Sequence, residues 1–423
     1  MSAQGMECVV HGALAALLRV MRVVGMIPVR LVPLSDAFVV RYSFAQDVIA
    51  RLLYCCFCLL LMTLELLNFI PQILSMNKSV QKRVMLLSTI AASFIRMTVT
   101  FVSILKGYQR TKQLCKNLNE IQKLNIEGVH DVAVANVEKR RYKLFVILVT
   151  TLPLINITDI IMNWDSTALN VSSEYFIRVL LYQFVIFTIS MLEGQFVFTI
   201  LSVHTTLQAL NRRLGKLLTD LKKNRDGITE ISSSHRILRQ LATSYSSLCD
   251  VMRTLDKENG LMILMTSILQ LLKATQSVFL LVVYWNINMP MPYTDMELKQ
   301  LTFNRTMQCC RFLIVLINIM FLLEPCQWTY NEMEVTRLFV TRMTHYAPTT
   351  SGPLVNELEM FYRVVFTNMP SYSPLQLFTL RRSFILELSG ALTTWLLIVL
   401  RDKTIKQEDT NTIRTGFNIT LNH

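Results

Sequence analysis

Seven apolar stretches, each about 20 residues long, constrain this chain more than any other feature of its sequence. They lie at approximately 48–70, 84–105, 144–163, 175–204, 261–285, 311–330 and 382–400. A helix needs about 20 mostly apolar residues to cross the hydrocarbon core of a bilayer. The stretches therefore predict an all-α, polytopic membrane protein with about seven transmembrane helices.

The composition excludes a soluble protein of this size. Only 17% of the 423 residues are charged, 52% are hydrophobic, and the mean hydropathy is +0.40, whereas soluble domains carry about 25% charged residues. The chain has no G-x-S-x-G, Walker or H-E-x-x-H sequence, and its six His are scattered between loops. We therefore expect no enzyme activity, no cofactor and no metal site.

The distribution of basic residues predicts how the chain is oriented. Of the 42 Lys and Arg, 28 fall in residues 1–47, 106–143, 204–260 and 324–382, and 10 fall in the loops that alternate with these. Cytosolic loops carry the excess of positive charge. The N-terminus is therefore predicted inside and the C-terminus outside, and the spread of these charges without interleaved aromatic residues argues against nucleic-acid binding.

This orientation divides the chain into three parts. Residues 1–47 form a cytosolic N-terminal segment, and residues 48–400 form the seven-span domain with cytosolic helical loops at 106–143, 204–260 and 331–381. Residues 401–423 form an extracellular tail. Within the first part, the apolar stretch 9–18 followed by Arg19, Arg22 and Arg30 predicts a short amphipathic segment at the cytosolic face.

Glycosylation sequons agree with the same orientation. Asn77, Asn170, Asn304 and Asn418 each begin an N-x-S/T sequence in a charge-poor loop or in the tail, and Asn156 begins a fifth near the outer end of its span. Glycan acceptors face the extracellular side. We take the first four as glycosylation candidates.

The loop at 204–260 has the periodicity of a helical hairpin that continues the fourth and fifth spans. Three- and four-residue steps, typical of one apolar helix face, place leucines at 207, 210, 214, 217, 218 and 221 and apolar residues at 237, 241, 248, 252 and 255. Leu114, Leu118, Ile121 and Leu124 form a weaker stripe in the loop at 106–143. These faces can pack within one chain or between subunits, and periodicity does not separate the two.

Charged and amide residues inside the spans suggest a ligand pocket. A charge at the centre of a span costs about 2.5–3.5 kcal/mol on insertion scales, so Glu65, Arg96, Glu193, Lys273 and Glu324 each need a partner, a cavity or water. One interpretation is ion pairing between spans. The other places a small-molecule pocket in the outer halves, with the candidates Glu65, Arg96, Gln183, Phe187, Lys273, Gln276 and Phe279.

The nine cysteines show no paired C-x-x-C spacing, so they support neither a zinc site nor a disulfide framework. Most lie in or beside apolar stretches, where cysteine behaves as a small hydrophobic residue. A disulfide of Cys309 or Cys310 at an outer loop stays open.

The last span carries a family resemblance. Thr394 and the apolar run 396–400, preceded by Gly390, resemble the motif of the insect gustatory receptor family, which reads T-Y, five hydrophobic residues, Q-F. Trp395 stands for the Tyr, Arg401 for the Gln and Asp402 for the Phe. Chain length, inverted topology and the long loop between the fourth and fifth spans also agree with this family.

The resemblance implies a tetrameric ligand-gated cation channel in the plasma membrane of sensory neurons, opened by a small-molecule tastant. The tetramer would be a homomer or would contain related receptor subunits. The last span would line the pore, with Thr394, Trp395, Leu397 and Arg401 as pore or gate candidates. Four Arg401 side chains in a cation pore would repel the permeant ion; we expect the side chain to turn to the outer interface, although altered conductance or different partner subunits would also fit.

Two other membrane functions compete with the channel. A seven-span G-protein-coupled chemoreceptor needs its N-terminus outside, against both orientation signals, and the third and seventh spans lack D-R-Y-like and N-P-x-x-Y-like sequences. A transporter predicts two related halves with broken spans, and the chain has no such repeat.

Overall fold

The structure is a computed structural model of the 423-residue chain. It describes residues 7–34, 38–74, 80–124, 173–223, 231–285, 295–346 and 352–395, together with Lys143 and Leu397. Helices dominate this part of the chain. The predicted helical membrane fold is confirmed.

The chain runs through its elements in the following order. The N-terminal part contains β1 (Cys8–Val10), α1 (Gly12–Val23), β2 (Val29–Pro33) and β3 (Phe38–Tyr42). Next come α2 (Phe44–Leu74), α3 (Val80–Leu105) and α4 (Gly107–Lys123), then the long helices α6 (Ser173–Lys223), α7 (Ile231–Trp285) and α8 (Asp295–Tyr346). The chain then forms α9 (Pro353–Thr367), the 3-10 turn η3 (Pro374–Gln376) and a helix over residues 383–395, called the last helix below.

Five described helices are long and apolar enough to cross a bilayer. They contain the segments Asp47–Glu65, Leu86–Leu105, Leu180–Lys223, Ser234–Val282 and Leu301–Tyr346, which correspond to the first, second, fourth, fifth and sixth predicted spans. The third predicted span lies outside the described residues. The seventh is described as the last helix up to residue 395, and at Leu397.

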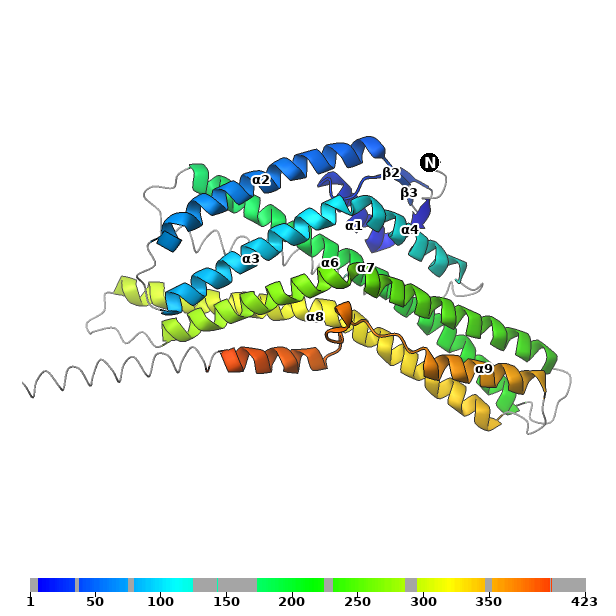
Figure 1. Cartoon of the computed structure of the whole chain (residues 1–423). Helices are drawn as coiled ribbons and strands as arrows, with labels where there is room; N and C mark the ends of the chain where they lie inside the picture. The colour runs from blue at the N-terminus through cyan, green and yellow to red at the C-terminus, as the bar shows by residue number, and fades with distance from the viewer. Residues whose placement is uncertain are drawn as a thin grey trace, which may run out of the picture.

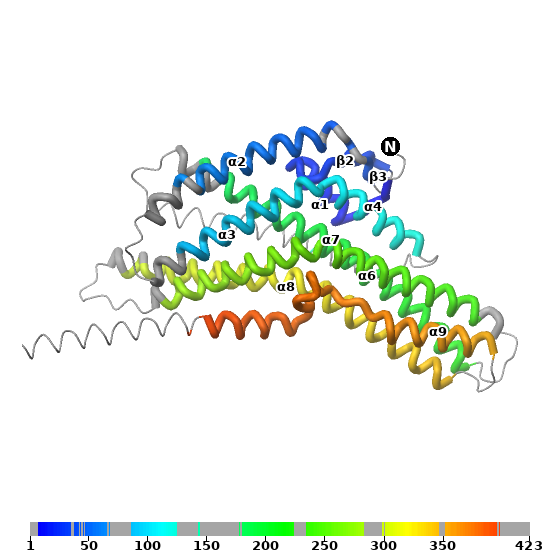
Figure 2. The backbone as a smooth tube through the Cα atoms, viewed as in Figure 1, coloured from blue at the N-terminus to red at the C-terminus, as the bar shows by residue number. Residues whose placement is uncertain are grey.

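Helices α6, α7 and α8 form one bundle that is much longer than a bilayer is thick. They contain 51, 55 and 52 residues, and α6 alone spans about 75 Å at about 1.5 Å per residue. Since the hydrocarbon core is about 30 Å thick, more than half of each helix lies outside it. Figures 1 and 2 show α2, α3 and the last helix along one half of the bundle and α9 along the other half.

The apolar faces of the helical hairpin pack within the chain. Leu207, Leu210, Leu214 and Leu248 are almost completely buried, and α9 covers this region with Leu354, Leu358, Phe361 and Val365. The predicted continuation of the fourth and fifth spans is therefore confirmed, and most of its apolar face is satisfied internally. Ile237, Leu338 and Met360 stay exposed in the single chain.

A small antiparallel sheet in the N-terminal segment adds to the predicted fold. Its strand order is β1-β3-β2, with Cys8 opposite Val40 and Leu31 opposite the same residue from the other side. Alternation along β2 buries Val29 and Leu31, while Arg30 is exposed. The amphipathic segment predicted at 9–18 is a helix from Gly12, with its apolar face on this sheet and on α6.

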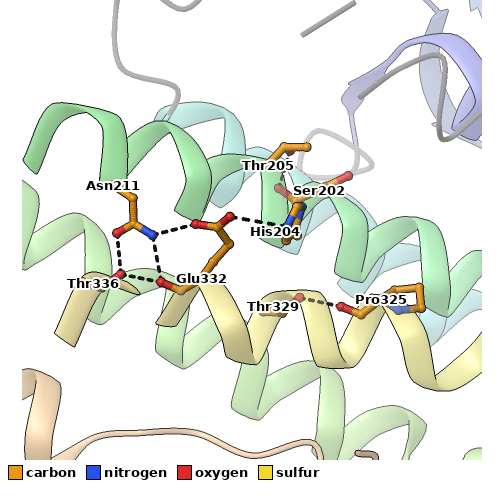
Figure 3. A network of polar contacts seen from close by, with 8 residues as sticks. All are labelled: Ser202, His204, Thr205, Asn211, Pro325, Thr329, Glu332 and Thr336. Atoms are coloured by element: carbon orange, nitrogen blue, oxygen red, sulfur yellow. Dashed lines mark hydrogen bonds and ion pairs between the residues drawn. The ribbon is translucent and has the colours of Figure 1, made fainter. Parts of the chain in front are cut away.

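A polar network joins α6 to α8 where the bundle continues beyond the spans (Figure 3). The Asn211 amide donates to the backbone carbonyl of Glu332 and to its carboxylate, both at 2.8 Å, and accepts from the Thr336 hydroxyl at 2.6 Å. His204 lies 3.9 Å from the same carboxylate. Asn211 and Thr336 are buried, so each polar group in this interface depends on the others.

We expect Asn211→Ala to destabilise the bundle by about 1–3 kcal/mol, because it removes the buried amide that bonds both the Glu332 carboxylate on α8 and the Thr336 hydroxyl. Thermal unfolding of the detergent-solubilised protein measures this. Thr219→Ala on the same helix is the control, since that hydroxyl is exposed and bonds only the Gly215 carbonyl. Equal melting temperatures for the two variants would contradict a structural role for the network.

Candidate functional site

Arg96 lies between α3 and α6 and is fixed by neutral groups. Its guanidinium donates to the Tyr182 hydroxyl, lies 4.2 Å from the centre of the Tyr182 ring, and donates to the Ser93 hydroxyl at 3.1 Å. Only 5% of the residue is exposed. Within the described residues Arg96 forms no ion pair, and its contacts there are with the neutral side chains of Tyr182 and Ser93.

The amide candidates of the pocket differ in how they are satisfied. Gln276 on α7 donates to the hydroxyls of Ser88 and Thr89 on α3, at 3.1 and 3.2 Å. Gln183, next to Tyr182 on α6, has a buried side-chain oxygen without a hydrogen-bond partner in the described structure. Phe187 lies one turn further along α6 and packs against the main core.

The acidic and basic candidates lie at different places in the bundle. Glu65 on α2 and Lys273 on α7 are half-buried, and Lys273 interacts electrostatically with Glu193 of α6. Glu324 does not belong to this region: its carboxylate pairs with Arg382 at the start of the last helix, with two contacts of 2.9 Å. The structure therefore separates four of the five intramembrane charges into an arginine–tyrosine contact, a buried Glu193 site with Lys273, and an ion pair on the last helix, while Glu65 lies half-buried on α2.

Glu193 borders a small polar cavity between α6, α7, α8 and the last helix. The volume of about 10 Å³ has room for about one water molecule. Its wall contains the Ser267 hydroxyl and the Gln270 side-chain oxygen, both buried and unpaired in the described structure. Thr266 also lines the wall, and its hydroxyl donates to the Ile263 carbonyl of the same helix at 3.1 Å. Asn318 of α8 and the apolar Phe384 and Leu388 of the last helix complete the wall.

The last helix has one packed face and one open face. Phe384, Leu388, Leu392 and Trp395 face the bundle, and the Trp395 ring meets Phe279 of α7 edge-on at 5.9 Å. The rest of the helix is exposed in the single chain and contains Leu386, Glu387, Ser389, Gly390, Ala391, Thr393, Thr394 and Leu397. Of the pore candidates, Thr394 and Leu397 are thus exposed, Trp395 contacts a pocket candidate, and Arg401 lies outside the described residues.

The segment between α9 and the last helix, residues 368–382, is clamped onto α7 and α8. The Tyr372 backbone N–H donates to the Tyr330 hydroxyl at 2.5 Å, and the Asp256 carboxylate lies beside the Ser373 backbone. Tyr372 is completely buried, and this burial raises the pKa of its hydroxyl. We call this segment the linker.

Close approach of α7 to the linker requires a glycine. A Cβ atom at Gly260 would lie 3.3 Å from the Leu375 backbone nitrogen and 3.6 Å from the Pro374 Cα. Leu375 and Gln376 both have positive φ, at 50° and 61°, a conformation that costs side-chain-bearing residues energy. The linker therefore stores a strained turn at the point where it crosses α7.

Among the glycosylation candidates, the structure places only Asn304. It lies half-buried in α8, close to the N-terminal end of that helix. Asn77, Asn170 and Asn418 lie outside the described residues. All four stay predictions.

The sequence did not single out the linker clamp or the Glu193 cavity. Tyr330 and Tyr372 are 42 positions apart, and only the fold brings them together. The cavity has a weak signature in the sequence, because the polar residues Thr266, Ser267 and Gln270 interrupt the apolar fifth span on one helical face.

We expect Gly260→Ala to lower the melting temperature of the protein. The gain in helix propensity, about 1 kcal/mol, is offset by pushing on a backbone that Tyr330 and Asp256 hold in place, since overpacking costs about 1–3 kcal/mol. Gly215→Ala is the matched control, because its added Cβ meets only a phenylalanine ring at 3.6 Å. If both variants melt at the same temperature, the linker is not clamped as described.

Comparison with known proteins identifies a family and two solved structures that this chain resembles. A family model described as 7tm Chemosensory receptor matches residues 14–400, while no curated protein matches the chain. Among solved structures the chain is similar to the insect olfactory receptor OR5 from Machilis hrabei in complex with eugenol, with a TM-score of 0.62, 11% identity, and coverage of 92% of this chain and 97% of that one. A second structure of that receptor gives the same TM-score and identity, with coverage of 91% and 97%.

The structural likeness shows the fold, and the family match extends over nearly the whole sequence. This family consists of receptors, so the expectation that the protein is not an enzyme is confirmed. The chain belongs to the 7tm chemosensory receptor family.

Proposed function

We propose that this chemosensory receptor is a gustatory receptor subunit that forms a non-selective cation channel opened by a small-molecule tastant. Four subunits, identical or related, surround a pore lined by their last helices in the plasma membrane of sensory neurons. The taste assignment and the tetramer rest on the resemblance of residues 390–402 to the insect gustatory receptor motif. The olfactory receptor OR5 supports the same overall helical arrangement.

The open face of the last helix is the observation that carries this proposal. Ser389, Thr393 and Thr394 present hydroxyls on one side, and Leu386 and Leu397 are 74% and 63% exposed in the single chain. Hydroxyls suit a hydrated cation path, and a ring of leucines can close a pore by dewetting. A face that contains both hydroxyls and leucines is more consistent with lining a pore between subunits than with facing lipid chains.

The contacts of α7 provide a route from ligand to pore. Gln276 faces α3, while Phe279, one turn away, meets Trp395 of the last helix. A ligand that displaces α3 from Gln276 would shift α7 and change the Phe279–Trp395 contact. Arg96, Gln183 and Phe187 on the neighbouring helices supply the donor, the acceptor and the apolar surface for such a ligand, with Glu65 and Lys273 as further candidates.

The linker transmits the same movement to the other end of the last helix. Tyr330 and Asp256 fix the linker, and the Glu324–Arg382 ion pair fixes the point where the helix begins. Opening then requires rotation of the last helix about this anchored end. The bundle of α6–α9 outside the spans, with its exposed Ile237, Leu338 and Met360, supplies the surface on which subunits associate.

We expect Leu397→Cys to make tastant-evoked currents sensitive to a charged methanethiosulfonate reagent applied during opening, with at least half of the current lost. Whole-cell recording during a screen of sugars, bitter compounds and other tastants measures this. Leu313→Cys is the control, because Leu313 is similarly exposed, at 56%, but lies on α8. Full modification of Leu397→Cys with unchanged current, or block that is equal in the wild type, would contradict a pore position.

A further inference from the structure

Two cysteines far apart in sequence meet in the N-terminal part of the fold. The Cys8 thiol of β1 donates to the Cys115 sulfur of α4, with the two sulfur atoms 2.9 Å apart. Both residues are buried, at 2% and 1% exposure, and both are free thiols. A disulfide bond is about 2.05 Å long, so the sulfur atoms need to approach by less than about 1 Å to bond.

The surrounding contacts already hold β1 against α4. Asn119 donates its side-chain amide to the Glu7 carbonyl at 2.9 Å, and Gln122 donates to the Val9 carbonyl at 2.7 Å. Together with Cys115 these residues occupy positions i, i+4 and i+7 on α4, which lie on one helix face. The thiol pair therefore lies in an interface that two side-chain to backbone hydrogen bonds hold together.

The hydrogen bond between the thiols prepares one of them for reaction. The thiolate is the reactive form of cysteine. The hydrogen bond donated by Cys8 lowers the pKa of Cys115, although burial opposes this effect, and the same bond raises the pKa of Cys8. Cys115 is thus the nucleophile of the pair, and Cys8 is the thiol that resolves it.

The position of Cys8 provides access for an oxidant. Strand β1 has only three residues and lies at the edge of the sheet, paired on one side with β3. Glu7 and His11, which flank the strand, are exposed. Short edge segments open locally at low free-energy cost, which brings a small oxidant into contact with sulfur atoms that are covered in the closed state.

We propose that Cys8 and Cys115 form a reversible, peroxide-driven disulfide that staples the N-terminal strand to α4. The Cys115 thiolate attacks hydrogen peroxide, which gives a sulfenic acid and hydroxide; the Cys8 thiol then attacks the sulfenic sulfur and releases water. In total, two thiols and one peroxide give one disulfide and two water molecules. A small thiol such as glutathione reverses the reaction by exchange.

The location gives the bond a regulatory consequence. Helix α4 begins two residues after α3 ends, and α3 contains Arg96 and the Gln276 partners. A disulfide that joins β1 to α4 would restrict movement at the inner end of α3. The residues lie on the side that we propose to be cytosolic, where thiols are kept reduced and disulfides are transient.

Thiol mapping on the full-length receptor in membranes of expressing cells tests the proposal without any tastant. Cells are treated with hydrogen peroxide, free thiols are blocked with N-ethylmaleimide, and the Cys8–Cys115 linked peptide is quantified by mass spectrometry. We expect the linked fraction to rise at least fivefold with peroxide and to return to baseline with dithiothreitol. Cys8→Ser and Cys115→Ser should abolish the link, whereas Cys309→Ser, at an exposed cysteine, should leave it unchanged.

The melting temperature distinguishes formation of the Cys8–Cys115 disulfide from nonspecific oxidation of the protein. Peroxide should raise the melting temperature of the wild-type receptor and of Cys309→Ser, but not that of Cys8→Ser. The proposal is overturned if peroxide modifies Cys309 while Cys8 and Cys115 are recovered as separately blocked thiols. It is equally overturned if the linked peptide is present at full occupancy before peroxide is added, since the bond would then be permanent.

Discussion

The mismatch between helix length and bilayer thickness determines most of this structure. Helices α6, α7 and α8 contain more than 50 residues each, whereas a bilayer accommodates about 20. The remaining turns must pack against protein outside the membrane, and α9 covers them there. One rigid bundle thus extends from the membrane into the water-exposed part of the protein. A displacement of α7 beside Gln276 therefore also displaces α7 at Gly260, where this helix contacts the linker.

Buried polar groups mark the positions where these helices are held in register. The Asn211–Glu332–Thr336 network joins α6 to α8, and Tyr330 and Asp256 hold the linker. In the absence of water such groups are costly unless they are paired. The polar cavity beside Glu193, with its unpaired Ser267 and Gln270, is the contrasting case: it lies against the last helix, the element that the proposed mechanism requires to move.

Hydrophobic patterning accounts for what the sequence predicted well. Five of the spans follow from the length of their apolar stretches, and the helical hairpin at 204–260 and the stripe Leu114–Leu118–Ile121 follow from helical periodicity; the structure buries most of these apolar residues. The β1-β3-β2 sheet was missed because its strands have three to five residues, too few for a clear alternation. Contacts such as Cys8–Cys115 and Tyr330–Tyr372 depend on tertiary packing, and no local pattern indicates them. Arg96 and Gln276 have the hydrogen-bond partners that buried polar side chains need, and the role of the pocket candidates in ligand binding stays a prediction.

The proposed orientation underlies the outer ligand pocket, the outward-running pore helix and the reducing environment of the cysteine pair. An epitope tag after His423, tested for antibody access in intact and in permeabilised cells, measures that orientation without knowledge of the ligand. The account predicts staining of intact cells for this tag, and staining only after permeabilisation for a tag at the N-terminus. The opposite pattern would reverse the topology, contradict the channel assignment and favour a G-protein-coupled receptor.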